Sequence, residues 1–173
     1  RSVNSLLTQL GATPVGMPVP AIPESLSKGV IDGTTIPWEV TAALKVPELV
    51  ENHTEFTGKA LYTLTFVLAM NKEKYESLSD AQKTAIDENS GLEFSVFAGG
   101  VMADADDPSR EAALDNGNEV ITLDADQTAE WRTLAQPVYD NWLADMSEKG
   151  IDGQALLDEA TYLIEKYTPQ YVK

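Results

Sequence analysis

Apolar residues recur at helical spacing along much of the chain. Four of them share one face of a predicted helix over residues 2–10, which Gly11 ends because glycine tolerates a left-handed C-terminal cap. Further helices are predicted over residues 23–28, 38–44, 71–78, 81–105, 107–117, 125–146 and 154–167. In these we expect a bend at Gly99 and Gly100 and a break at Pro137, because proline cannot donate the helical hydrogen bond.

Four shorter runs have the composition of β-strands. Residues 60–70, ALYTLTFVLAM, are the richest in β-branched and aromatic side chains, and they predict a strand buried on both faces. Residues 13–19 and 30–36 predict short strands between the first helices, and residues 119–123 predict a fourth. The alternation of helix and strand predicts an α/β fold with parallel strands.

Composition and charge exclude several functional classes. The 12 basic residues face 28 acidic ones, a net charge of −16, so no basic face is available for nucleic acid or anionic lipid. No apolar run approaches the roughly 18 residues that a membrane span requires. The absence of cysteine excludes disulfides, thiolate metal ligands and a cysteine nucleophile.

An acidic run is the one pattern that suggests a metal. Asp104, Asp106 and Asp107 loosely resemble a calcium loop, but an EF-hand requires Gly at the sixth position and Glu at the twelfth. Those positions hold Ser109 and Asp115, so a solvated junction between helices is the favoured interpretation. We expect no metal site.

Two further residues could carry acid–base chemistry. His53 is the single histidine, and no nucleophile spacing or second ligand accompanies it, so a structural role is favoured. Glu39 follows Trp38, where a perturbed pKa is plausible, although stabilisation of a helix start is the favoured role. No glycine-rich phosphate loop is present, and nothing in the pattern argues for catalysis or a cofactor.

The segment 30–40, VIDGTTIPWEV, is the strongest candidate for binding a small molecule. It reads as an apolar strand that ends in two threonines, a proline and Trp38. Ligands of open α/β sheets bind beyond the carboxyl ends of strands, where hydroxyls can hydrogen-bond and an indole can cover an apolar ring. A role for Trp38 in a domain core is an equally good interpretation.

Three motifs, in this order, resemble one protein family. Residues 11–18, GATPVGMP, resemble its LGA-x-P-x-x-M motif, and residues 29–33, GVIDG, resemble its AL-x-x-G-x-x-DG motif. Residues 70–86, MNKEKYESLSDAQKTAI, resemble its N-x-x-x-(Y/W)-x-x-L segment followed by D-x-Q-x-x-(I/V). The chain is thus similar throughout to the solute-binding components of TRAP transporters, the DctP-type periplasmic receptors.

The resemblance implies a periplasmic-binding-protein-like fold, a mixed sheet flanked by helices in each of two lobes. It also implies that this chain is the carboxyl-terminal half of a longer receptor. Residues 1–59 and 102–136 would belong to the second lobe, and residues 60–101 would be a strand and long helix that return to the first. Residues 137–173 would form bracing helices.

The implied function is capture rather than catalysis. A small organic carboxylate would be held by closure of the two lobes and delivered to TRAP membrane subunits, without a cofactor. The net charge of −16 opposes such an anion at long range, so local donors must select it. Two alternatives stay open: a non-binding fragment that forms a homodimer through residues 60–70, and an α/β hydrolase-like enzyme that uses Glu39 or His53.

The resemblance also indicates candidate ligand residues. The family's carboxylate-clamping arginine falls by spacing upstream of Arg1, which makes Arg1 itself a weaker candidate. Val19 stands where sialic-acid-type members have an aromatic residue, and residues 34–37 replace their Q-E-N-P run, which favours a more apolar or aromatic carboxylate. The ligand-binding candidates are Met17, Val19, Thr34, Thr35, Ile36, Pro37 and Trp38.

Overall fold

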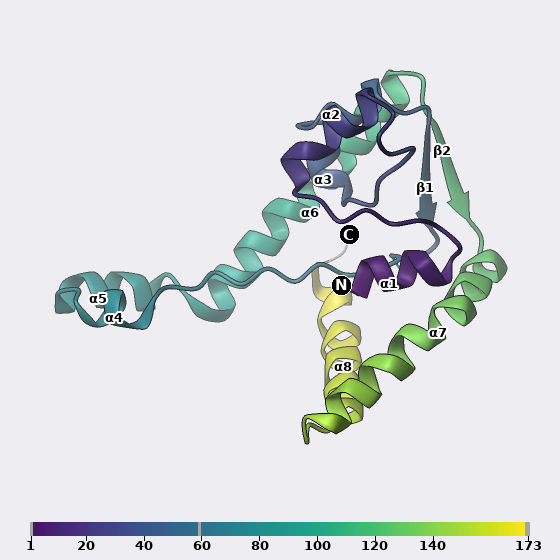
Figure 1. Cartoon of the computed structure of the whole chain (residues 1–173). Helices are drawn as coiled ribbons and strands as arrows, with labels where there is room; N and C mark the ends of the chain where they lie inside the picture. Colours follow the sequence, from purple (N-terminus) through teal and green to yellow (C-terminus); the bar gives the residue numbers. More distant parts are fainter. Residues whose placement is uncertain (1, 59, 172–173) are drawn as a thin grey trace. The chain divides into compact units, whose positions relative to one another are not determined.

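The computed structural model describes residues 2–58 and 60–171 (Figure 1). Its elements are α1 (Ser2–Gln9), a 3₁₀ turn (Val19–Ala21), α2 (Ile22–Ser27), α3 (Trp38–Thr41), a second 3₁₀ turn (Val46–Glu48), β1 (Asn52–Phe56), α4 (Lys72–Glu76), α5 (Asp80–Glu88), α6 (Gly91–Asp115), β2 (Glu119–Leu123), α7 (Ala125–Glu148) and α8 (Gly153–Tyr171). Within these ranges, no helix is both long and apolar enough to cross a bilayer.

Strands β1 and β2 form the sheet of the described chain (Figure 1). Glu119 donates its backbone N–H to the carbonyl of Glu51, and Thr57 donates to Leu123, so the two strands run parallel. The strand predicted over residues 119–123 is confirmed to the residue. Strand β1, which begins at Asn52, is not among the strands predicted from the sequence.

Helix boundaries follow the local capping signals. Gly11 adopts φ +86° after α1, and the backbone N–H of Ala12 returns to the carbonyl of Leu7, which confirms the predicted stop. At the start of α7, the Asp124 side chain accepts from the backbone of Gln127 while the Gln127 side chain accepts from the N–H of Asp124. This reciprocal capping box fixes where α7 begins.

The helix predicted over residues 81–105 is interrupted, and the restart predicted at residue 107 is wrong. The side chains of Asn89 and Ser90 bond to carbonyls of the preceding turn and end α5, because they compete with the helical ladder. From Gly91, α6 continues to Asp115 through both central glycines and Pro108.

Pro137 does not break α7, contrary to the prediction. Each helical proline deprives the carbonyl four residues earlier of its donor, and those residues here are Asp104 and Thr133. Both are exposed, so water can satisfy the freed carbonyls, and the flanking turns keep each helix continuous.

The strands predicted over residues 13–19 and 30–36 are also wrong, since both segments are irregular. Prolines at positions 14 and 18 remove two backbone donors from the first segment. In the second, Gly33 and Pro37 bracket the threonines, and the chain turns directly into α3. Val15, Val19 and Val30 are 58%, 45% and 65% exposed, so the apolar composition of these segments indicated neither a strand nor a buried core.

Residues 60–70 do not form a strand, and they are not buried on both faces. Phe66, Val67 and Leu68 are 68%, 82% and 83% exposed. A strand exists only if its backbone groups meet a neighbouring strand, and among the described residues none lies against this segment. The segment is apolar, as its sequence shows, but no strand of the described chain pairs with it.

The chain divides into two compact units. Unit 1 contains Arg1–Ala21, Thr54–Leu61 and Ile121–Lys173, and unit 2 contains Ile22–His53 and Tyr62–Val120. In unit 1, α1 packs against α7, and the Phe56 ring meets Trp131 edge-on with centroids 5.3 Å apart.

The core of unit 2 lies where α3 packs against α6 (Figure 1). Ser109 and Ala113, one turn apart on α6, are 5% and 0% exposed. Such small side chains at i and i+4 allow a neighbouring backbone to approach closely. Thr41 at the end of α3 and Val46 in the following turn are buried beside them. This packing fixes the position of α3, and therefore of the segment that enters it.

Candidate functional site

The predicted binding segment 34–38 is half-buried along its whole length and belongs to unit 2. Pro37 takes an extended conformation, φ −65° and ψ 157°, and serves as the N-cap of α3. Its fixed φ suits a helix entry. The hydroxyl of Thr41 donates to the carbonyl of Trp38 at 2.9 Å, which closes this single turn of helix. The structure therefore holds Trp38 at the first position of a short, anchored helix.

Asp106 of α6 completes the anchoring of α3. Its carboxylate accepts the backbone N–H of Glu39 at 3.0 Å. An acceptor at this place satisfies one of the donors that every helix start leaves unpaired. Asp106 was considered in the sequence only as part of an acidic run, and its role in the structure is to cap a helix 67 residues earlier in the chain.

The carboxyl group of Glu39 is in an unfavourable environment for a negative charge. Burial raises the pKa of Glu39 above 4.5, a backbone hydrogen bond lowers it, and the charge of Asp106 and a side-chain hydrogen bond with Asp106 raise it further. Glu39 thus lies beside a second carboxyl group, and the charge of Asp106 disfavours ionisation of Glu39. The sequence suggested a perturbed pKa at Glu39 without a direction, and in the structure the pKa is raised.

Tyr62 also interacts with Thr35 and Glu39, and the sequence did not indicate this. Burial raises the pKa of its phenol, a hydrogen bond with the side chain of Thr35 lowers it, and the charge of Glu39 raises it. Tyr62 lies in the segment that was read as a buried strand, which hid its polar role.

Trp38 stacks on His53. Their ring centroids are 4.9 Å apart with planes inclined by 34°. The Nε2 atom of His53 lies 3.3 Å from the Oδ1 atom of Asn118, whose Nδ2 donates to the carbonyl of Val50 at 2.8 Å. Because the amide group is oriented by Val50, its oxygen faces the imidazole, and Nε2 of His53 carries the proton. His53 therefore supports the indole, in agreement with the structural role favoured from the sequence.

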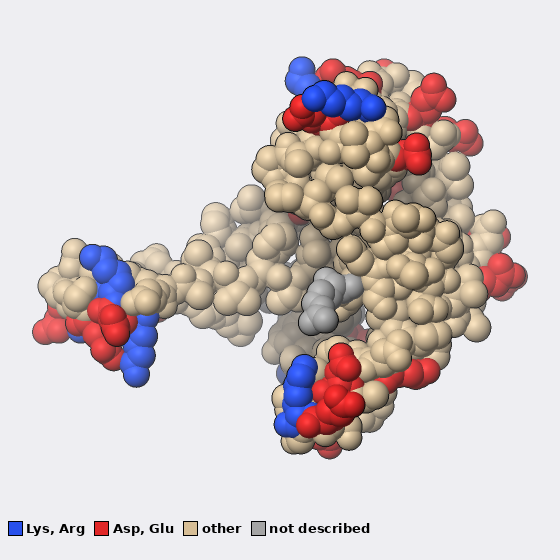
Figure 2. Space-filling model, in the orientation of Figure 1, with Lys and Arg blue, Asp and Glu red and all other residues tan. Residues whose placement is uncertain are grey.

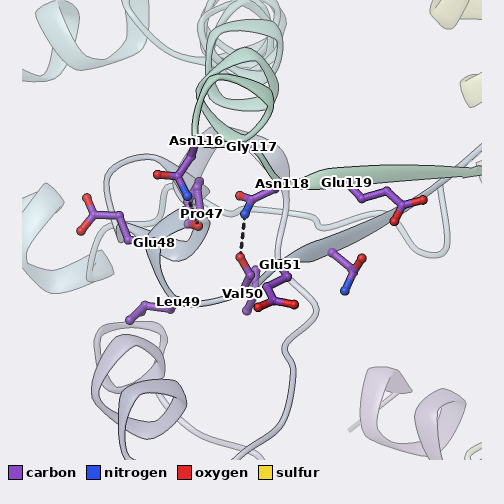
Figure 3. Close-up of a pocket in the computed structure, with 10 residues that line it drawn as sticks. Pro47, Glu48, Leu49, Val50, Glu51, Asn116, Gly117, Asn118 and Glu119 are labelled. Atoms are coloured by element: carbon purple, nitrogen blue, oxygen red, sulfur yellow. Dashed lines mark hydrogen bonds between the residues drawn. The ribbon is translucent and has the colours of Figure 1, made fainter.

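A polar recess lies nearby in unit 2, between the turn before β1 and the turn before β2 (Figure 3). It has a volume of about 580 Å³ and is lined by Pro47, Glu48, Leu49, Val50, Glu51, Asn52, Asn116, Gly117, Asn118 and Glu119. The side chains of Asn116 and Asn118 donate to the carbonyls of Pro47 and Val50, at 2.7 and 2.8 Å.

The recess does not suit an organic anion. Three carboxylates line it, and no Lys or Arg is among the lining residues. Two of its three asparagines, Asn116 and Asn118, already tie the two turns together (Figure 3). We assign the recess a structural role.

The other candidate residues are placed elsewhere. Met17 is half-buried in the irregular segment before α2, and Val19, which is 45% exposed, begins the first 3₁₀ turn. Both belong to unit 1, whereas residues 34–38 belong to unit 2. Arg1 lies outside the described residues.

Surface charge offers an anion no long-range attraction. On the face drawn in Figure 2, basic side chains gather over α2, over α4 and α5, and over α8, with acidic side chains next to each group. With a net charge of −16, any carboxylate ligand has to be selected by close contacts.

Comparison with known proteins gives the chain its family. The model of the DctP family, bacterial extracellular solute-binding protein family 7, matches residues 2–145. The chain belongs to this family. The resemblance drawn from the three motifs is therefore confirmed.

Two solved structures show the same fold at high identity. A TRAP solute-binding protein from Rhodoferax ferrireducens T118, in complex with copurified benzoate, is 46% identical over 98% of this chain and 53% of its own, with a TM-score of 0.92. A TRAP solute-binding protein from an unidentified marine microbe, specific for aromatic acid ligands and bound to metahydroxyphenylacetate, is 42% identical over 100% of this chain and 54% of its own, with a TM-score of 0.91. These confirm the periplasmic-binding-protein-like α/β class.

A curated relative is more distant. The C4-dicarboxylate-binding periplasmic protein DctP of Rhodobacter capsulatus is 27% identical over 157 residues, which are 90% of this chain and 45% of that protein. The chain thus spans about half the length of the proteins it matches.

Proposed function

We propose that this chain is part of a periplasmic receptor that captures a small aromatic carboxylate and delivers it to the membrane subunits of a TRAP-type secondary transporter. The observation that carries the proposal is the 46% identity, over nearly the whole chain, to a TRAP solute-binding protein that copurified with benzoate. Family membership independently supports solute binding, and its description as extracellular supports the periplasmic location.

The proposed ligand contacts follow the candidates from the sequence. Residues 34–38 would form one wall of the site, with Trp38 against the ring and the hydroxyls of Thr34 and Thr35 beside it. Anchoring of α3 and stacking on His53 support this wall, because binding costs less when the contacting groups are already fixed. Met17 and Val19 remain proposed ligand contacts on the sequence argument alone.

The boundaries of the lobes are likewise part of the proposal. Residues 1–59 and 102–136 would belong to the second lobe, residues 60–101 would return to the first, and residues 137–173 would brace both. Ligand capture would close the lobes, and closure would be stabilised by contacts from each side.

Segment 60–70 suggests how the chain behaves on its own. Its exposed apolar side chains form a surface that water disfavours, so we propose that the isolated chain pairs with a second copy through this segment. Light scattering tests this pairing: a strictly monomeric chain would contradict it.

The receptor would bind its ligand without turnover. The family consists of substrate-binding proteins, and the half-buried acids found here cap a helix and pair with each other. Incubation of benzoate with the receptor, followed by chromatography, should return benzoate unchanged.

The experiment that tests the proposal is a thermal-shift series on the full-length receptor that contains this chain. A ligand that binds only the folded state stabilises it by about 2.7 kcal/mol at 100 times its dissociation constant, which raises the melting temperature by several degrees. Benzoate should produce this shift, and benzylamine, which has the ring but the opposite charge, should not. Absence of a shift with benzoate and other aromatic acids would refute the proposal.

A further inference from the structure

The turn between α6 and β2 contains a chemically labile pair of neighbouring residues. Asn116 is the only asparagine of the sequence that a glycine follows. Because Gly117 has no side chain, its backbone nitrogen can approach the side-chain carbonyl of Asn116 without steric hindrance, and such a pair loses ammonia more readily than other asparagine pairs. Both residues are exposed, so water can reach them.

The reaction has two steps. The backbone nitrogen of Gly117 attacks the Cγ atom of Asn116, the Cγ–Nδ2 bond breaks, and Nδ2 leaves as ammonia with the proton of the Gly117 amide. Water then opens the cyclic imide. Cleavage of the new N–Cγ bond leaves aspartate, whereas cleavage of the bond to the backbone carbonyl carbon leaves isoaspartate, whose main chain has gained a methylene group.

The fold engages both reacting groups. Gly117 takes φ +86° and donates its N–H to the carbonyl of Leu114 at 2.9 Å, while Asn118 donates its N–H to Ala113 at 3.0 Å, the pattern of a Schellman motif. The amide proton that the reaction removes is therefore already in a hydrogen bond. Nδ2 of Asn116, the leaving group, donates to the carbonyl of Pro47 at 2.7 Å (Figure 3). Attack requires the end of α6 to fray first.

Conversion would weaken the contacts of this turn. A carboxylate at residue 116 has no N–H to donate to Pro47, and it would join the three glutamates that already line the recess. The extra methylene of isoaspartate would also shift the two Schellman hydrogen bonds out of register. Asn118 leaves the same turn, and its side chain bonds to the carbonyl of Val50 and lies beside His53.

We propose that Asn116 is a site of spontaneous deamidation, that fraying of the carboxyl end of α6 sets its rate, and that the product loosens the turn from which Asn118 supports His53. The proposal concerns the covalent state of the protein and holds whichever ligand the receptor binds. The structure also explains why the labile pair is present: the helix cap requires a glycine at positive φ, and the link to Pro47 requires a short side chain with an N–H donor.

The test is peptide mapping by mass spectrometry after incubation of the full-length receptor at mildly alkaline pH. A synthetic peptide of residues 112–120 gives the unprotected rate. Asn116 in the folded receptor should convert at least tenfold more slowly than in this peptide, which corresponds to about 1.4 kcal/mol for opening the turn. In denaturing urea the two rates should agree, and Asn89, which a serine follows, should convert more slowly than Asn116.

Two variants separate the cause of protection from the chemistry of the pair. Asn118→Ala keeps the Asn-Gly pair but removes the link to Val50, so Asn116 should convert at least threefold faster than in the wild type. Asn116→Gln should not convert, because its longer side chain would have to close a larger ring. Equal rates in the folded receptor and the peptide would overturn the protection, and no conversion of Asn116 in urea would overturn the site itself.

A third variant, Asn116→Asp, represents the aspartate product and tests the consequence. Amide hydrogen exchange in the turn, residues 114–119, should become at least threefold faster than in the wild type, because the link to Pro47 is lost. Asn141→Asp, the same change at an exposed position of α7, should leave exchange in the turn unchanged. If Asn116→Asp exchanges as slowly as the wild type, the proposed loosening is wrong.

Discussion

The junction of α7 and α8 permits a prediction whose size can be worked out from distances. Gly153 is buried at the start of α8, and a Cβ atom there would lie 3.0 Å from Cβ of Met146, 3.1 Å from Cδ2 of Leu143 and 3.2 Å from Cζ3 of Trp142. All three are closer than an ordinary contact, so Gly153→Ala forces this turn apart. Overpacking of this kind costs about 1–3 kcal/mol.

One effect opposes that cost. Alanine restricts the unfolded chain more than glycine does, which stabilises the fold by about 0.4–1 kcal/mol where the backbone conformation is compatible. The backbone of Gly153 is not in the left-handed region, so this gain applies in full. The net expectation for Gly153→Ala is a loss of about 1 kcal/mol.

Urea unfolding followed by tryptophan fluorescence measures this change, because Trp142 is one of the crowded neighbours. Gly100→Ala is the matched control: it lies inside α6, has no left-handed φ, and its Cβ would meet nothing within 4 Å. That variant should gain about 0.5–1 kcal/mol, as expected for an exposed helix interior. If Gly153→Ala proves as stable as the wild type while Gly100→Ala stabilises, the close packing of the α7–α8 turn is refuted.

Three further predictions concern the candidate site. Asn118→Asp cannot donate to the carbonyl of Val50 and should cost about 1–2 kcal/mol, seen as a lower melting temperature; no change would mean that this amide link is dispensable. Burial raises the pKa of Glu39 above 4.5, so the folded state is favoured by protonation of this group, and that contribution is lost as pH rises. Glu39→Gln should therefore be more stable than the wild type at pH 7 and lose that advantage toward pH 4.5. A constant difference across that range would contradict the assigned cause. Finally, His53→Ala should shift Trp38 emission to longer wavelength by exposing the indole, whereas His53→Phe, which preserves a stacking partner, should shift it less; equal shifts would argue against the stack.

The sequence predicted those features that depend on neighbours along the chain. Helix α1, its glycine cap and strand β2 were all found from local spacing and composition. Family membership was also accessible, because motifs such as residues 11–18 are short and contiguous. These signals need no knowledge of tertiary contacts.

Features that depend on distant partners were missed. Residues 60–70 have the composition of a strand, yet strand formation requires a second backbone that composition does not reveal. The break predicted at Pro137 and the helix restart predicted at residue 107 are both wrong, because exposure of the freed carbonyls cannot be read from the pattern. In the same way, neither Tyr62 nor Asp106 could be connected with Glu39, since their association is created only by the fold.

The long sequence separations inside unit 2 have a consequence for how the wall around Trp38 comes into being. Asp106 and Asn118 hold it through hydrogen bonds that span 67 and 65 residues, to Glu39 and His53 respectively. Contacts this distant along the chain form late in folding, after the intervening loop has been closed. A synthetic peptide of residues 30–40, or a graft of that segment onto another scaffold, should therefore be disordered and should not bind an aromatic acid. Nascent chains that end before Asn118 should likewise not bind it.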